Sequence, residues 1–409
     1  MASKETQGQK EFEERGGGLL SIVTKEPPKT LTITAQMHDH VMTVSGVPAR
    51  VFYYEPRPFV DAFEAVGAYY GMDGVIPFAD VYNYEAEALG QPMIYGENSM
   101  PTIDFRDPLI KKPGDLAKIK LPDWEHTKRV PFLFESTRLA VERGLTTQGV
   151  NCAPFSLAVG IRSYPLLIHD IKKNPAFAHE LFTWLVDDVL TSFIRAFHKY
   201  AGVNIVLPAD AWSAFPNVTP DMLDEWVVPY DQRLQANLAP DGIYCVNMAG
   251  DYCEERLERF DKQILWRCFD AQTRASGSPV ALLGMGRWQD YPLEAVAEYL
   301  DAQKAKGVSV ALTTGVNARL LRDGPVDAIV DNIKRFIDIL ARRTHVDLFL
   351  ANIPADTPPQ HVSTAVQAAH TYGRLPLAEN LEEVEFKPEP IGSFKDYLAQ
   401  RPDRDRFKI

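Results

Sequence analysis

Residues 204–247 read NIVLPADAWSAFPNVTPDMLDEWVVPYDQRLQANLAPDGIYCVN. The segment opens with a short apolar run, residues 204–209, and closes with a second one, residues 243–247. Between them, Thr219-Pro220 begins a helical pattern that continues to about Leu238, since proline is favoured in the first turn of a helix. A strand, a helix and a second strand in this order are typical of the βα unit of a parallel sheet.

The same alternation recurs along the chain after residue 30. Strands are expected at eight runs: 31–37, 74–79, 147–151, 204–209, 243–247, 279–285, 308–313 and 347–351. Further helices are expected from Asn174-Pro175 to Lys199, from Pro292 to Lys306, from Pro325 to Arg342, and from Thr357 to Tyr372. Eight parallel strands close a barrel. The alternative is an open doubly wound sheet, but no GxGxxG motif follows the first run. We therefore expect an α/β protein with one (β/α)₈ TIM barrel.

The barrel is predicted to span residues 31–375. Residues 1–30 are expected to form a flexible N-terminal extension with a Gly16–Gly18 run, and residues 376–409 a charged tail packed on the barrel. A polar, proline-rich stretch at about 91–131 follows the second strand. We interpret this stretch as an insertion over the barrel mouth.

Composition limits the classes of function. The formal net charge of the 409 residues is −12, without a basic stripe, which argues against a nucleic-acid partner. No apolar segment approaches the length of a membrane span, and the polar N-terminus has no apolar signal-peptide core. The four cysteines show no CxxC spacing and are expected to be free thiols of a reducing compartment, so a cytoplasmic location is expected.

Polar residues just beyond the strands of such a barrel face the substrate. In chain order these are His38 and His40, Asp80, Asn151 and Cys152, Asp210 and Trp212, Asn247 and Asp251, Arg287 and Trp288, Asn317, and Asn352. Either aspartate, Asp80 or Asp210, has the alternative of capping the next helix through backbone N–H groups. His38 and His40 point the same way only if the first strand continues to them. A loop is the alternative, and we expect a structural or surface role for at least one of the two.

Two sets of candidate site residues follow. The candidate catalytic residues are Asp80, His38, His40 and Asp210. The candidate substrate-binding residues are Tyr54, Tyr82, Asn151, Trp212, Asn247, Arg287, Trp288 and Asn317. The aromatic members either wall a pocket for an aromatic compound or pack at the barrel rim.

Several segments, in order, resemble the uroporphyrinogen decarboxylase family, which includes methyltransferases that exchange methyl groups with protein-bound corrinoid. The segments are Phe78-Ala-Asp80 with Glu85–Gly90, Ala153–Ala158, Asp210 with the helix that ends near Tyr230, Gly315–Pro325 and Ile353–Pro359. The resemblance covers about residues 30–375. It implies a barrel, matches Asp80 to the decarboxylase's catalytic aspartate, and implies a homodimer as the expected assembly.

The chain departs from both known activities of that family. The arginine-rich loop of the decarboxylase reads Gln36-Met-His38-Asp-His40 here, and a tetrapyrrole with many carboxylates needs guanidinium partners. The zinc ligands of the thiol-directed methyltransferases match Asn247, Ala249 and Ala351. A zinc site at Cys245 and Cys253, or at His38 and His40 with Asp80 or Asp210, is left open.

The leading hypothesis from the sequence is the demethylating component of a corrinoid-dependent system. It would transfer a methyl group from a small O- or N-methylated donor, such as a methoxy-aromatic compound, to cobalamin on a separate corrinoid-binding protein. Asp80, Asp210 or a histidine would protonate the leaving group. The alternatives are a metal-independent decarboxylase or lyase with Arg287 as its carboxylate clamp, and a non-catalytic ligand-binding member of the family.

Overall fold

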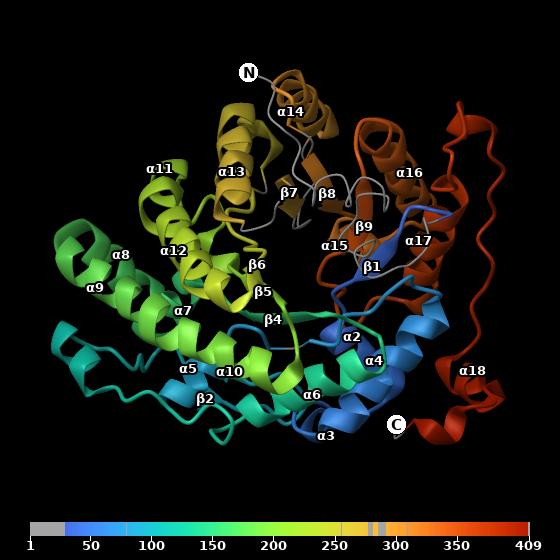
Figure 1. Cartoon of the computed structure of the whole chain (residues 1–409). Helices are drawn as coiled ribbons and strands as arrows, with labels where there is room; N and C mark the ends of the chain where they lie inside the picture. The colour runs from blue at the N-terminus through green and yellow to red at the C-terminus, as the bar shows by residue number, and fades with distance from the viewer. Residues whose placement is uncertain are drawn as a thin grey trace.

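Two arcs of parallel strands form the centre of the fold (Figure 1). The computed structural model describes residues 29–78, 80–254, 256–276, 281–284, 292–308 and 310–407. One arc has the order β4 (Gln148–Cys152), β5 (Ile205–Ala209), β6 (Tyr244–Cys245). The other has the order β1 (Ile33–Ala35), β9 (Val346–Leu350), β8 (Val310–Thr314), β7 (Ala281–Gly284).

The last strand pairs with the first, as in a barrel. Ile33 is in register with Leu348, and Ala35 with Leu350. Pairing of strands does not connect the two arcs within the described residues, so the structure shows a helix-rich α/β fold without a closed barrel there. The expected second strand is the main difference: residues 74–78 form no strand. Pro77 lies in this segment and has no N–H to donate to a neighbouring strand.

Helices follow or precede the strands in the expected alternation. They are α2 (His38–Ser45), α3 (Ala49–Phe52), α4 (Pro56–Tyr70), α5 (Tyr84–Leu89), α6 (Val130–Glu142), α7 (Pro154–Arg162), α8 (Tyr164–Lys173), α9 (Pro175–Trp184), α10 (Thr191–Ala201), α11 (Pro220–Met222), α12 (Val228–Leu238), α13 (Lys262–Ala275), α14 (Leu293–Ala305), α15 (Ala318–Asp323), α16 (Val326–Phe336), α17 (Pro359–Tyr372) and α18 (Phe394–Gln400). Short π-helical segments, Leu185–Leu190, Leu223–Val227 and Ile337–Ala341, continue α9, α11 and α16. Among the described residues, no helix is long and apolar enough to cross a membrane.

The insertion contacts α7, which follows β4, and the segment just beyond β5. It carries a two-stranded antiparallel hairpin, β2 (Met93–Ile94) with β3 (Thr102–Ile103). The Ile110 N–H donates to the Ile161 carbonyl in α7 at 2.9 Å, and Phe105 contacts Trp212 just beyond β5, with ring centroids 5.7 Å apart. These contacts bring the insertion to the ends of the β4–β6 arc.

The C-terminal tail lies along one side of the molecule and brings α18 beside α4 (Figure 1). Tyr69 in α4 holds it there, since its hydroxyl donates to the Gly392 carbonyl at 2.6 Å and its ring packs against Phe394 and Tyr397.

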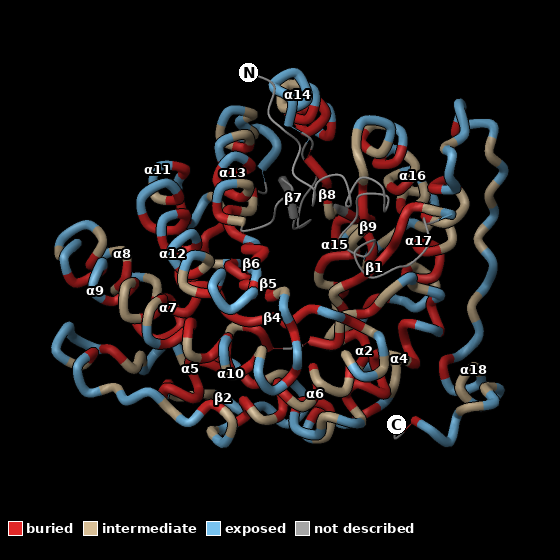
Figure 2. Tube along the Cα trace, viewed as in Figure 1, coloured by how far each residue is buried: buried red, intermediate tan, exposed pale blue. Residues whose placement is uncertain are grey.

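Buried residues follow the strands and the inner sides of the helices (Figure 2). Most belong to a large core between strands and helices. A smaller inner cluster comprises Phe78, Val81, Val150, Leu207, Ala209 and Val246. Because residues alternate between the two faces of a strand, this cluster shows which side chains of β4–β6 point inward.

Candidate active site

Asp210 follows β5 and is 2% exposed. Its Oδ1 accepts hydrogen bonds from the backbone N–H of Ser156, at 2.8 Å, and from the Ser156 hydroxyl, at 2.5 Å. Ser156 lies in the first turn of α7, so this oxygen bonds to the start of an earlier helix. It does not cap the next helix, which is what the alternative interpretation predicts, because Asp210 makes no side-chain cap at Ala211–Ser213. The second oxygen, Oδ2, has no hydrogen-bond partner. Asp210 therefore has one oxygen that is bonded to Ser156 and one buried oxygen without a hydrogen-bond partner.

Burial raises the pKa of Asp210 to about 7. The two bonds from Ser156 oppose this rise, because they stabilise the carboxylate, and the negative charge of Asp251 adds to it. Asp251 itself accepts a hydrogen bond from Gln272 at 3.1 Å. A carboxyl group with a pKa near 7 can donate and take up a proton at neutral pH.

Asp80 has a different environment. It is 1% exposed and adopts a left-handed backbone conformation with φ 59°. Asn83 donates to its Oδ1, and Arg129, at the start of α6, forms an ion pair with its Oδ2. Burial raises the pKa of Asp80, and Arg129 opposes this rise. Both oxygens are engaged, which makes Asp80 a weaker candidate for proton donation than Asp210.

The two candidate histidines are separated because residues 38–45 form α2 instead of extending the strand. Two residues along a helix are about 200° apart around its axis, so the side chains diverge. His38 contacts Phe78, which precedes Asp80 by two residues. His40 is fully buried against Tyr70 of α4, with 2.7 Å between His40 Nε2 and the Tyr70 hydroxyl. His40 thus lies in the core and does not join the other candidates.

The hydrogen bonds of His38 determine its tautomer. Its Nδ1 lies 3.0 Å from the Phe78 carbonyl oxygen, which can only accept, so Nδ1 carries the hydrogen. Its Nε2 lies 3.1 Å from Nε2 of Gln36 and accepts from that amide. Burial lowers the pKa of His38. His38 is therefore a neutral ring that presents an acceptor nitrogen.

An aromatic wall adjoins Asp210. Trp212 packs edge-on with Phe105 of the insertion and stacks on Tyr164 of α8, with both centroid distances at 5.7 Å. The Trp212 backbone N–H donates to the same Ser156 hydroxyl that donates to Asp210. One serine thus bonds both the acid and the backbone of Trp212. Tyr82 lies nearby. Burial raises the pKa of its phenol, and negative charges on neighbours that include Asp210 raise it further, so the phenol stays protonated.

Three predicted polar binding residues have other contacts. Gly149 has Phe197 of α10 on its side-chain face, and Val150 points inward, so Asn151 faces the helices. Asn247 also faces outward and donates to the Ala275 carbonyl at the end of α13 at 2.7 Å. Asn317 caps α15 through its amide oxygen. For Asn151 and Asn247 the structure gives a helix-facing position, while Asn317 fits the capping role.

The structure describes one of the other three predicted binding residues. Tyr54 follows α3, is 42% exposed and lies over the Arg129 guanidinium at 5.9 Å from its ring centroid. Arg287 and Trp288 lie outside the described residues.

Sequence reasoning missed the partners of the two aspartates. Arg129 lies in the insertion, far along the chain from Asp80, and also donates to Glu87 at 2.8 Å. Ser156 belongs to one of the family segments, but nothing in that segment indicates its bond to Asp210. Glu85 accepts from the Cys152 N–H at 2.9 Å, and burial raises its pKa to about 7. Periodicity gives no signal for such contacts, because they join separate βα units.

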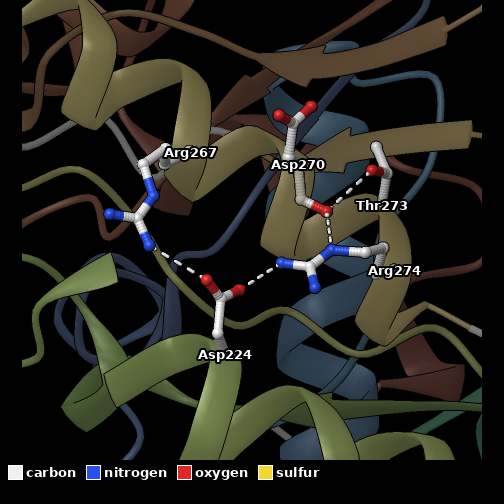
Figure 3. A pocket seen from close by; sticks show the side chains of 5 residues that line it. All are labelled: Asp224, Arg267, Asp270, Thr273 and Arg274. Carbon is white, nitrogen blue, oxygen red and sulfur yellow. Dashed lines mark hydrogen bonds and ion pairs between the residues drawn. The ribbon is translucent and has the colours of Figure 1, made fainter. Parts of the chain in front are cut away.

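A surface pocket of about 380 Å³ lies on α13 and the adjacent π-helical segment (Figure 3). Its lining residues are Asp224, Arg267, Asp270, Thr273 and Arg274. Asp224 pairs with both arginines, and the Arg274 Nε donates to the Asp270 backbone carbonyl (Figure 3). Since its charges are already paired, we interpret this pocket as a contact between neighbouring helices.

Comparison with known proteins places these features in a family. Residues 19–372 match the family described as uroporphyrinogen decarboxylase (URO-D). The chain belongs to the uroporphyrinogen decarboxylase family. A methyltransferase from Methanosarcina mazei has a similar fold, with a TM-score of 0.64 and 16% identity over 87% of this chain and 98% of that chain. At this identity the likeness shows the fold alone.

A second solved structure, a β-glucosidase mutant derived from a hyperthermophilic tetrameric structure, covers 88% of this chain and 98% of its own at 12% identity. Its TM-score of 0.33 is too low to support any inference. None of the curated proteins matches the chain.

The residues at the family's zinc positions in this chain do not fit a zinc ion. Asn247, Ala249 and Ala351 supply no thiolate or imidazole. The alternative pair fails as well, since His40 is directed to Tyr70, away from His38. Within the described part of the chain, no three His, Cys, Asp or Glu residues come together as a metal site.

Proposed function

We propose that this protein transfers a methyl group from a small O- or N-methylated compound, such as a methoxy-aromatic, to a corrinoid on a partner protein. The observation that carries the proposal is Asp210, an acid with a free oxygen beside an aromatic wall. Membership of the family and the fold of the Methanosarcina mazei methyltransferase support it. The corrinoid is the second substrate, whose reduced cobalt accepts the methyl group.

The chemistry explains why an acid is needed. When a methyl ether is cleaved, the bond between methyl carbon and oxygen breaks, the methyl group is transferred, and the oxygen departs with the electron pair. That oxygen needs a proton as the bond breaks. Asp210 donates it in our proposal, and the phenol of Tyr82 donates a hydrogen bond to the same oxygen. His38 is excluded as the donor, since its Nε2 presents a lone pair.

The aromatic wall supports a flat substrate. Phe105, Trp212 and Tyr164 come from the insertion, the end of β5 and α8, and Phe105 is 40% exposed. Stacking on such rings holds an aromatic compound by burial of its apolar faces. Ser156 bonds both Asp210 and the Trp212 backbone, and in our proposal the methoxy oxygen of a stacked ring lies toward Asp210.

No specific observation favours the lyase alternative. It needs a free guanidinium, but Arg287 lies outside the described residues and Arg129 is already paired with Asp80 and Glu87. Zinc is not part of the proposal, because the donor set does not fit.

The test uses cob(I)alamin, generated chemically, in place of the unidentified partner. The protein is incubated with a panel of methoxylated and N-methylated compounds, and the cobalt spectrum is followed. We expect conversion to methylcobalamin with at least one methoxy-aromatic, and its loss in Asp210→Asn. Methylation by methyl iodide confirms that the cobalt is competent. With competent cobalt, no conversion over the panel would contradict the proposal and favour a non-catalytic ligand-binding role.

A further inference from the structure

A second pocket, of about 420 Å³, lies beside Arg129. Its lining residues are Tyr54, Pro56, Lys128, Arg129, Pro131, Phe132, Glu135 and Tyr200. They come from the segment after α3, the start of α6 and the end of α10. The volume falls in the range of pockets that hold small molecules.

Arg129 is 6% exposed yet is not fully satisfied. Its Nε donates to Glu87, and one terminal nitrogen pairs with Asp80. The other terminal nitrogen, Nη1, is buried without any hydrogen-bond partner. A buried donor on a charged group is costly to leave unpaired, so the position calls for an acceptor that the chain does not supply.

Lys128 supplies an unpaired charge beside this unpaired donor. It is exposed and forms no ion pair with a described residue. Its backbone is left-handed, with φ 54°, a conformation that is unfavourable for lysine and persists only where the surroundings impose it. The chain thus places two adjacent cations at the pocket wall.

The acid in the pocket does not neutralise these cations. Glu135 pairs with Arg138, at 2.7 and 2.8 Å, and accepts from the Tyr200 hydroxyl at 3.2 Å. Hydrogen bonds from Arg138 lower its pKa. The charge left for a ligand is therefore the positive charge of Lys128, next to the unpaired Nη1 donor of Arg129.

The remaining walls are apolar or aromatic. Tyr54, Phe132 and Tyr200 present rings to the pocket. Tyr54 also lies over the Arg129 guanidinium, at 5.9 Å, and is 42% exposed. The Tyr54 ring therefore lies between solvent and the Arg129 guanidinium on this side of the pocket.

We propose that this pocket binds a small carboxylic acid with a flat apolar body. The carboxylate lies between Lys128 and Nη1 of Arg129, and the body packs against Tyr54 and Tyr200. Carboxylates match guanidinium geometry, and charged hydrogen bonds of this kind are short and strong. The site is distinct from Asp210, and the proposal does not rest on methyl transfer.

The test is calorimetric titration of the full chain with benzoate, and with benzamide as its neutral counterpart. We expect benzoate to bind at least tenfold more tightly, with an affinity that falls as salt rises. Lys128→Gln should weaken benzoate binding about fivefold or more, as expected for a lost charge contact of about 1 kcal/mol. Lys172→Gln, which removes another exposed lysine, should leave it unchanged.

A third variant addresses the aromatic wall without disturbing Arg129, whose ion pairs also stabilise the fold. Tyr54→Ala should weaken the binding of benzoate, while Asp210→Asn should not affect it. Equal binding of benzoate and benzamide, no binding at about millimolar benzoate, or wild-type affinity in Lys128→Gln would each overturn the proposal.

Discussion

Replacement of Asp210 by asparagine isolates its role as a proton donor. The amide oxygen of the introduced asparagine can accept both bonds that Ser156 now donates to Oδ1 of Asp210, at 2.8 and 2.5 Å, so the fold is retained. What is lost is an acidic proton on the second oxygen. General acids contribute about 10²–10⁴ in rate, which is about 3–5 kcal/mol of barrier at about 1.36 kcal/mol per factor of ten. We expect methyl ether cleavage to slow by this amount.

The pH dependence gives a second, independent signature. Because burial raises the pKa of Asp210 to about 7, the protonated fraction falls as pH rises through that value. The wild-type rate should therefore decline on the alkaline side, with an apparent pKa near 7. Ser156→Ala removes a donor that stabilises the carboxylate, so the pKa of Asp210 should rise and the decline should move to higher pH. Asp210→Asn should show no such decline.

The assay is single-turnover methyl transfer followed by cobalt absorbance across this pH range. Anisole serves as the methyl ether, and phenyltrimethylammonium is its matched control. The leaving group of this control is a neutral amine, which needs no proton. The Asp210→Asn variant should cleave it at a rate close to wild type. A rate of ether cleavage within about twofold of wild type in Asp210→Asn, far below the factor for a general acid, would refute the assignment.

Three further predictions concern stability and substrate choice. Both carboxyl oxygens of the fully buried Asp231 lack partners, and burial raises its pKa, so the free energy of unfolding should fall as pH rises above the usual Asp range. Asp231→Asn should remove this pH dependence in urea unfolding and stabilise the protein by about 1–3 kcal/mol at pH 8. An unchanged pH dependence in the variant would contradict this prediction. Burial lowers the pKa of His40 to about 4, so about 3 kcal/mol of stability should be lost as pH falls from about 6.5 to 4. Thermal melts of His40→Gln should lack this loss. An equal loss in the variant would show that protonation of His40 is not its cause. Phe105→Ala should raise KM for aromatic donors up to about tenfold with little change in kcat; an equal rise for an aliphatic methyl ether would count against stacking.

Much of the fold could be predicted because each βα unit carries local signals. Pro175, Pro220 and Pro359 begin helices as the sequence indicates, since their fixed backbone angle suits a first turn. Residues 74–78 were the exception. Their apolar side chains predicted a strand, but Pro77 removes a donor on which strand pairing depends.

The site was predictable only in part. Position beyond a strand identified Asp210 and Trp212, which do lie together. Position beyond a strand did not predict that Asn151 and Asn247 face the helices, which depends on the alternation of side chains along each strand. It left open which of His38 and His40 faces the site, and α2 separates them, with His40 in a structural position in the core. Arg129 escaped notice because its link to Asp80 joins the insertion to the second unit, and no spacing in the sequence records that contact.

The most direct measurement follows the methyl group itself. The protein is incubated with cob(I)alamin and a methoxy-aromatic carrying a trideuterated methyl group, and both products are analysed by mass spectrometry. The account predicts trideuterated methylcobalamin and the corresponding phenol in equal amounts, at a rate that depends on Asp210. Phenol without labelled methylcobalamin, or loss of carbon dioxide from a carboxylated donor with the methoxy group intact, would contradict it.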